Sequence, residues 1–150
     1  MPPYKVKDTK YGLFYDVLTH QHDGDAGGFF RNPVYADLMA EYYVAYPFSV
    51  LGRYFFPRGV EDIFETVCPI SATRCRSFIV KTRDHDLDEP VDDWIAFQAQ
   101  VNEEDREIVE SQRPAQLPLK IADEFHVAAD GLSVAYRRKW RKLGFKGDFL

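Results

Sequence analysis

Two runs in which apolar and polar residues alternate limit most strongly what this chain can fold into, and a short polar turn joins them. The runs are EDIFETVCPI (residues 61–70) and RCRSFIVKT (residues 74–82), and the turn between them reads SATR. Alternating segments joined in this way predict an antiparallel hairpin. Alternation over residues 13–18 predicts a further strand, and apolar residues at every even position from Leu38 to Val50 predict one long, half-buried strand. The sheet is therefore predicted to be antiparallel.

Two helices are predicted after the sheet. The first covers residues 91–112, because Pro90 can sit at a helix start, acidic residues occupy the first turn, and Pro114 stops the pattern. The second runs from Gly131 to Leu143, with Asp130 as its N-cap. Strands followed by helices indicate an α+β fold. A chain of 150 residues with 45% hydrophobic content is typical of one domain, so residues 1–150 are expected to form a single unit.

Charge and hydropathy exclude several classes of protein. The net charge of -5 argues against general nucleic-acid binding, which normally needs a basic surface. Basic residues gather only in RRKWRK (residues 137–142), where an amphipathic helix with a solvated polar face is expected; a membrane-binding or partner-binding helix is the alternative. The most apolar run is broken by Pro47 and Arg53, so no transmembrane segment is predicted.

The cysteines and histidines carry no recognisable motif. Cys68 and Cys75 lie on either side of the predicted turn and could face each other across the hairpin, but they make no C-x-x-C pair. The N-terminus, MPPYKVKDTK, lacks an apolar signal region, so a cytoplasmic protein with free thiols is predicted. His20 and His22 fall in a glycine-rich loop, where solvated surface residues are expected rather than metal ligands.

One carboxylate of the predicted long helix stands at an unusual position. Trp94, Phe97, Val101 and Ile108 form an apolar stripe, and Asp105 lies on the same stripe, roughly 40° from Val101 around the helix axis. A carboxylate on a buried face is costly unless it is paired, hydrogen-bonded or bound to a metal. Three interpretations therefore remain: a partly exposed position, a structural ion pair with an arginine, or a metal ligand.

The stretches NEEDREIVESQR (residues 102–113), followed by LPLK, and DGLSVAYRRKWRKL (residues 130–143) resemble the C-terminal end of the large (alpha) subunit of Rieske-type non-haem iron oxygenases. The similarity is to the branch that contains aromatic-ring hydroxylating and O-demethylating enzymes. It implies a helix-grip fold of the Bet v 1/START type, in which a curved antiparallel sheet packs on the long helix.

The resemblance also implies a site. In that family, two histidines and one carboxylate hold a mononuclear Fe(II), and the carboxylate corresponds to Asp105, with Glu110 at the family spacing. Phe97 and Val101, on the preceding turns, are the candidate substrate-pocket residues, with plain core packing as the alternative. No catalytic acid, base or nucleophile is assigned.

The implied partners are a hydrophobic or aromatic small-molecule substrate, a reductase or ferredoxin that supplies electrons, and further copies of the subunit in a homotrimer. Neither nucleic acid nor membrane is expected as a partner.

Two family features are missing from this sequence. The C-x-H and C-x-x-H pairs that hold the [2Fe-2S] cluster are absent, and so is the spaced histidine pair of the mononuclear iron. The chain is therefore expected to be an incomplete, C-terminal portion of a catalytic domain, with a [2Fe-2S] cluster only in a full-length protein. The first hypothesis is a portion of an iron-dependent oxygenase that hydroxylates or demethylates an aromatic substrate with O2. The second is a non-enzymatic helix-grip module that binds an apolar small molecule.

Overall fold

The fold is α+β, as predicted. The computed structural model describes residues 5–20, 37–71 and 73–144. In this part of the chain, six strands form one antiparallel sheet in which neighbours in sequence are neighbours in space. The strands are β1 (Lys7–Asp8), β2 (Gly12–His20), β3 (Asp37–Ala45), β4 (Ser49–Phe56), β5 (Gly59–Ser71) and β6 (Arg74–Arg83). The helices are α1 (Val91–Ser111) and α2 (Gly131–Lys142), with short 3-10 turns η1 (Ile121–Asp123) and η2 (Ala128–Asp130) between them.

The single long strand predicted from Leu38 to Val50 is wrong. Residues 46–48 form a turn that separates β3 from β4. Pro47 lies in this turn because it has no N–H to donate to a strand ladder. The alternation misled the prediction because the even-numbered positions face the same side of the sheet in both strands, so the pattern continues through the turn.

One face of the sheet forms the core. Its inward-pointing side chains on four neighbouring strands pack into one buried cluster: Val17, Ala40, Tyr54, Phe56 and Ile63. Tyr15 and Tyr42 extend this cluster as a stacked pair with ring centroids 4.6 Å apart. The predicted hairpin is confirmed as β5 and β6, with Val67 opposite Ser77 and Ile63 opposite Lys81.

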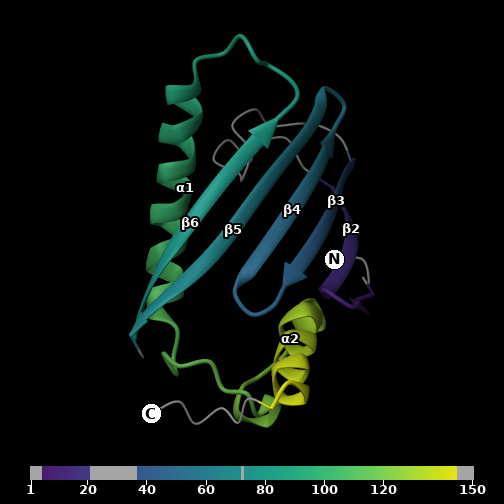
Figure 1. Ribbon diagram of the computed structural model, residues 1–150, viewed down its shortest axis with the longest axis vertical. Helices are drawn as coiled ribbons and strands as arrows, with labels where there is room; N and C mark the ends of the chain where they lie inside the picture. Colours follow the sequence, from purple (N-terminus) through teal and green to yellow (C-terminus); the bar gives the residue numbers. More distant parts are fainter. Residues whose placement is uncertain (1–4, 21–36, 72, 145–150) are drawn as a thin grey trace.

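The two helices occupy different parts of the molecule, with α1 along the length of the sheet and α2 at its lower end (Figure 1). Helix α1 runs beside β6, whereas α2 lies below the turn between β3 and β4. The Tyr136 hydroxyl donates a hydrogen bond to the Pro47 carbonyl at 2.7 Å, and the Trp140 ring packs against Phe48 with centroids 5.7 Å apart. No described helix is both long and apolar enough to cross a bilayer.

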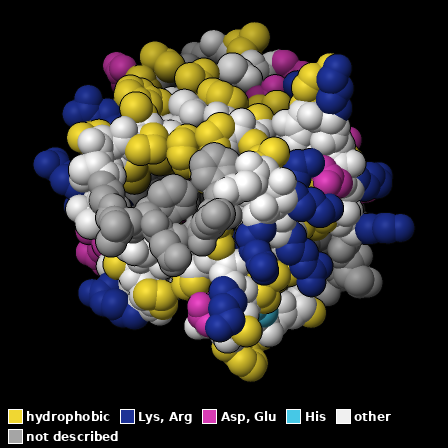
Figure 2. Space-filling model, turned by 60° about the horizontal axis from the view of Figure 1, so that its bottom comes forward, with side chains coloured by type: hydrophobic (Ala, Val, Ile, Leu, Met, Phe, Trp, Pro, Cys, Tyr) yellow, Lys and Arg dark blue, Asp and Glu magenta, His cyan; other side chains and the backbone are white. Residues whose placement is uncertain are grey.

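The basic segment of α2 differs from the prediction at one residue. Figure 2 brings the α2 end of the molecule forward and shows lysine and arginine side chains grouped on one side of that face. Arg137, however, is buried, where it contacts the Glu124 carboxylate and donates to the Ser133 hydroxyl. Asp130 stands at the N-cap as predicted, but its carboxylate accepts from the Val127 amide rather than from α2.

The two cysteines do not face each other. Cys68 pairs with Arg76 and Cys75 pairs with Pro69 across the hairpin. Directly paired residues share a face and successive residues alternate, so the two thiols point to opposite faces of the sheet. Both are free and exposed, and the suggested contact between them is wrong.

Candidate metal and substrate site

Helix α1 is anchored to the sheet at its N-terminal end. Trp94 is buried there, and its indole N–H donates to the Glu89 carboxylate at 2.9 Å. The Arg83 guanidinium lies 4.1 Å from the centroid of the Trp94 ring, and the Lys81 ammonium lies 5.0 Å from it. Both cations come from β6, so the start of α1 is fixed against the last strand of the sheet.

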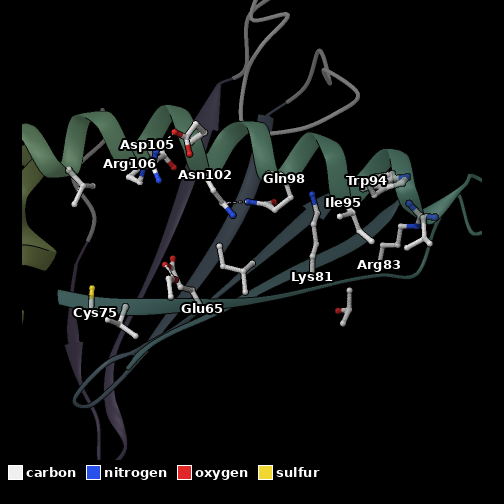
Figure 3. A pocket seen from close by; sticks show the side chains of 18 of the residues that line it. Glu65, Cys75, Lys81, Arg83, Trp94, Ile95, Gln98, Asn102, Asp105 and Arg106 are labelled. Atoms are coloured by element: carbon white, nitrogen blue, oxygen red, sulfur yellow. Dashed lines mark hydrogen bonds and ion pairs between the residues drawn. The ribbon is translucent and has the colours of Figure 1, made fainter. Parts of the chain in front are cut away.

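A cavity of about 910 Å³ separates the rest of α1 from the sheet (Figure 3). We call it the α1–β6 cavity. The sheet contributes Glu65 and Val67 from β5 and Cys75, Ser77, Ile79 and Lys81 from β6. The helix contributes a mixed wall that includes Trp94, Ile95, Gln98, Asn102, Asp105, Arg106, Val109 and Glu110. Ligand pockets in proteins are commonly of this size and this mixture of apolar and polar groups.

Asp105 lies on the wall of this cavity but is exposed rather than buried. It follows Val101, which is the last buried residue of α1; Ile108 and Val109 are 63% and 68% exposed. The helix therefore projects beyond the part of the described structure that covers it. The neighbouring Arg106 is engaged by Glu103, and no described residue forms an ion pair with Asp105. Of the three interpretations, the exposure agrees with a partly exposed position, and the structural ion pair finds no partner among the described residues.

Phe97 and Val101 lie beside the cavity rather than on its wall. Val101 is buried, and the half-buried Phe97 ring has the Lys81 ammonium 6.0 Å from its centroid. The adjacent residues Gln98 and Asn102 line the cavity instead, and the Gln98 amide donates to the Asn102 carbonyl oxygen at 2.8 Å. A role for Phe97 and Val101 in substrate binding stays a prediction.

A buried carboxylate that the sequence analysis missed lies next to the cavity. Glu61 on β5 is 0% exposed, and its oxygens lie 2.9 Å from the Lys81 ammonium and 3.2 Å from His85 Nε2. Arg58 approaches it at 3.3 Å, and His85 Nδ1 is 2.9 Å from the Asp86 carboxylate. The Lys81 ammonium has no well-aligned hydrogen bond, so its contact with Glu61 is mainly ionic. The sequence carried a signal, because Glu61 and Lys81 both stand at inward-facing positions of the predicted hairpin.

The histidines whose side chains are described lie away from Asp105. His85 belongs to the Glu61 cluster, and His126 Nε2 is 3.0 Å from the Ile121 carbonyl. His22 and the side chain of His20 lie outside the described residues. Within residues 5–20, 37–71 and 73–144, no three histidine, cysteine or acidic side chains form a group that could hold a metal ion. The described residues therefore do not form a complete metal site by themselves.

Comparison with known proteins gives one family and two relatives. Residues 23–144 match the vanillate O-demethylase oxygenase C-terminal domain. The methylxanthine N3-demethylase NdmB of Pseudomonas putida is 35% identical over 80 residues, which is 53% of this chain and 21% of the relative. The methylxanthine N1-demethylase NdmA of the same organism is 35% identical over 83 residues, 54% of this chain and 22% of the relative. The matched stretch thus spans about a fifth of the length of each relative.

Proposed function

Because the chain belongs to the family of vanillate O-demethylase oxygenase C-terminal domains, and is the C-terminal part of a Rieske-type oxygenase alpha subunit, we propose that it helps an iron-dependent oxygenase to demethylate or hydroxylate a hydrophobic aromatic substrate with O2. The observation that carries the proposal is the position of Asp105. It is an accessible carboxylate without a described ion-pair partner, and it stands on the wall of a ligand-sized cavity.

Asp105 is the metal ligand that this chain contributes. A ligand carboxylate must be free of competing cations, and no lysine or arginine in the described structure neutralises it. Helix α1 carries it about three turns after Trp94, which fixes the start of the helix. The family implies a mononuclear iron, which supplies open coordination positions for oxygen chemistry when it is bound.

The described residues do not form a complete iron site. One carboxylate without neighbouring histidines cannot hold Fe(II) tightly, because affinity depends on several preorganised ligands. The two histidine ligands, the [2Fe-2S] cluster and the reductase or ferredoxin contact are therefore assigned to regions outside the described residues. Assembly as a homotrimer and a helix-grip arrangement, with the sheet wrapped around α1, belong to the same proposal.

The α1–β6 cavity is the proposed substrate site. Val67, Ile79, Ile95 and Val109 give it apolar walls, and the linked Gln98 and Asn102 amides add groups that can orient a ring substituent. The names of the two relatives state that they act on methylxanthines, which are planar ring compounds. An aromatic substrate with a methyl group directed towards Asp105 suits this wall. The non-enzymatic binding module is not favoured, because both relatives are demethylases.

Activity of the full-length oxygenase tests this proposal. Asp105→Ala should abolish O2-dependent product formation while the circular dichroism spectrum stays unchanged. Glu110→Gln is the matched control: Glu110 lines the same cavity but is rotated about 140° from Asp105 around the helix, so it does not point towards the same metal position. Activity retained in Asp105→Ala, or lost equally in both variants, would overturn the assignment.

A further inference from the structure

The charged side chains on the wall of the α1–β6 cavity are distributed unevenly along its length. Lys81 and Arg83 lie beside Trp94, at the end where α1 begins (Figure 3). Glu65 lies closer to Asp105, towards the other end (Figure 3). The N-terminus of α1, which is the positive end of the helix dipole, is at the same end as the two cations. The cavity therefore has a positive end near Trp94 and a carboxylate-bearing end near Asp105.

The two cations at the positive end differ in their protein partners. The Lys81 ammonium lies 2.9 Å from the buried Glu61 carboxylate, so its charge is compensated. Arg83 forms no ion pair with a carboxylate among the described residues. One of its terminal nitrogens donates to the Glu89 backbone carbonyl at 3.0 Å. A guanidinium carries five N–H donors, so Arg83 keeps both its charge and further donors for a ligand in the cavity.

Trp94 fixes the orientation of the Arg83 guanidinium. The guanidinium carbon lies 4.1 Å from the centroid of the Trp94 ring, and this ring is buried and bound through its N–H to the Glu89 carboxylate. An arginine stacked on an aromatic ring presents a planar fork, which can bind a carboxylate through two parallel hydrogen bonds. Because the fork is already in place, binding costs little side-chain entropy.

The separation of Arg83 from Asp105 limits the ligand that can use both. Trp94, against which Arg83 stacks, precedes Asp105 by about three turns, which is roughly 16 Å along the helix axis. The Arg83 side chain and the metal proposed at Asp105 both reach into this space. A single aromatic ring fits between them when it carries the methyl group at one end and an anionic group at the opposite end.

We propose that Arg83 binds a carboxylate on the aromatic substrate, at the end of the ring opposite the methyl group. This ion pair directs the methyl group towards Asp105, while Val67 and Ile79 line the cavity beside the ring. The inference rests on the proposed role of the cavity as the substrate site, and it names the residue that orients the substrate there.

Equilibrium binding to the full-length, metal-loaded oxygenase under anaerobic conditions tests this role. The probes are 4-methoxybenzoate and 4-methoxybenzamide, which share a ring and nearly a shape but differ in charge. The wild type should bind the acid at least about tenfold more tightly than the amide, because only the acid forms a charge-assisted bidentate pair. Equal affinity, a preference for the amide, or no binding of either probe would overturn the inference.

Substitution of Arg83 should remove this preference. Arg83→Gln should weaken binding of the acid by about tenfold or more and leave binding of the amide unchanged, which also shows that the cavity is intact. Arg83→Lys keeps the charge but not the fork, so its preference for the acid should be intermediate, and it carries the test if Arg83→Gln does not fold. Equal weakening of both probes would contradict a carboxylate contact.

Arg76→Gln is the matched control. Arg76 is an exposed arginine on the same strand, and strand alternation places it on the opposite face from the cavity. Its replacement should leave both affinities unchanged. If Arg76→Gln weakens acid binding as much as Arg83→Gln does, the preference reflects the overall charge and the inference is wrong. It is also wrong if the preference survives in Arg83→Gln and disappears when the mononuclear metal is removed, because the metal then binds the carboxylate.

The outcome is separable from the test of the proposed function. Loss of activity in Asp105→Ala together with equal binding of the two probes would leave the oxygenase assignment intact and overturn only the role of Arg83. Retained activity in Asp105→Ala, with a preference for the acid that depends on Arg83, would do the reverse.

Discussion

Asp105 and Glu61 are two carboxylates with opposite environments, and the difference fits the proposed role of Asp105 as a metal ligand and a structural role for Glu61. Asp105 is exposed on α1, has no described ion-pair partner and is free to bind a cation. Glu61 is fully buried on β5 with Lys81, His85 and Arg58 around it. Removing one partner of such a buried cluster leaves uncompensated charge, which is why its members are costly to replace singly.

The structural role of Glu61 gives a stability prediction. Glu61→Ala should lower the free energy of unfolding by about 3–5 kcal/mol, because Lys81 and Arg58 lose their buried counter-ion. Urea denaturation followed by circular dichroism measures the change. The double variant Glu61→Leu with Lys81→Met should recover much of the loss, since it removes both charges. A change below about 1 kcal/mol in Glu61→Ala would mean that the cluster is dispensable.

At the residue scale, helical spacing gave the direction of Asp105 but not its exposure. Periodicity reports which way a side chain points around the helix axis, and it does not report whether another layer covers that side. Ile108 points the same way and is also exposed. Glu61 could have been found from its inward-facing position, but its partner His85 lies beyond β6, where strand alternation no longer applies.

Helix α1 is held unevenly along its length. Its first turn carries the buried Trp94, with Arg83 and Lys81 against the ring, whereas the last two turns carry exposed apolar residues. The N-terminal half therefore contributes most of the packing energy of this helix.

Substitutions along α1 test this uneven support. Trp94→Ala should destabilise the fold by about 3–5 kcal/mol, because it empties a buried position and removes both cation contacts. Ile108→Ala should change stability by less than about 0.5 kcal/mol, because the side chain is already exposed. Urea denaturation of both variants gives the comparison, and a larger loss in Ile108→Ala would mean that the end of α1 is covered.

Helix α2 has a pH-sensitive tether to the sheet. The Lys139 ammonium donates to the Asp8 carboxylate at 2.5 Å, and this hydrogen bond lowers the pKa of Asp8 below its ordinary value. A carboxyl group whose pKa is lower in the folded state than in the unfolded state stabilises the fold at pH values above its pKa in the unfolded state. This stabilisation is lost as the pH falls through its pKa in the folded state. Asp8→Asn should therefore lower the melting temperature slightly at about pH 7, and the difference should shrink towards zero at strongly acidic pH. A difference between wild type and variant that persists at the acidic pH would contradict the tether.

At the element scale, the sequence predicted both helices to within one or two residues and the β5–β6 hairpin. Prolines and caps fix helix ends locally, so no distant contact was needed. The division of residues 38–50 into β3 and β4 was missed. Even-numbered residues face the same side of the sheet before and after the turn, so the alternation of apolar residues shows no break there. The wide separation between α1 and β6 could not be predicted, since it depends on how two distant elements pack.

At the scale of the whole molecule, the proposed iron site needs ligands beyond the described residues. The family implies an iron held by three protein ligands, and the described residues supply one candidate. The assignment to the oxygenase family rested on the residues around Asp105 and on the terminal segment, and the family match over residues 23–144 confirms it. The identity of the substrate could not be predicted, because the shape of a pocket depends on how distant elements pack.

The 150-residue chain by itself should bind iron only weakly. After anaerobic Fe(II) loading and desalting, it should retain far less than one iron per chain and show no oxygenase activity with an added electron donor. Exposed Ile95, Ile108 and Val109 on α1 should also favour self-association. Near-stoichiometric iron in the wild type that is lost in Asp105→Ala, His20→Ala and His22→Ala would show that the histidines of this chain complete the site.

The mononuclear iron content of the full-length oxygenase tests the ligand assignment most directly. Total iron is measured for the wild type, Asp105→Ala and Glu110→Gln, and cluster iron is subtracted by means of acid-labile sulfide. We predict that the wild type and Glu110→Gln retain the mononuclear iron, and that Asp105→Ala loses most of it while keeping its cluster and its fold. Mononuclear iron retained at the wild-type level in Asp105→Ala would contradict the assignment of Asp105 as the metal ligand.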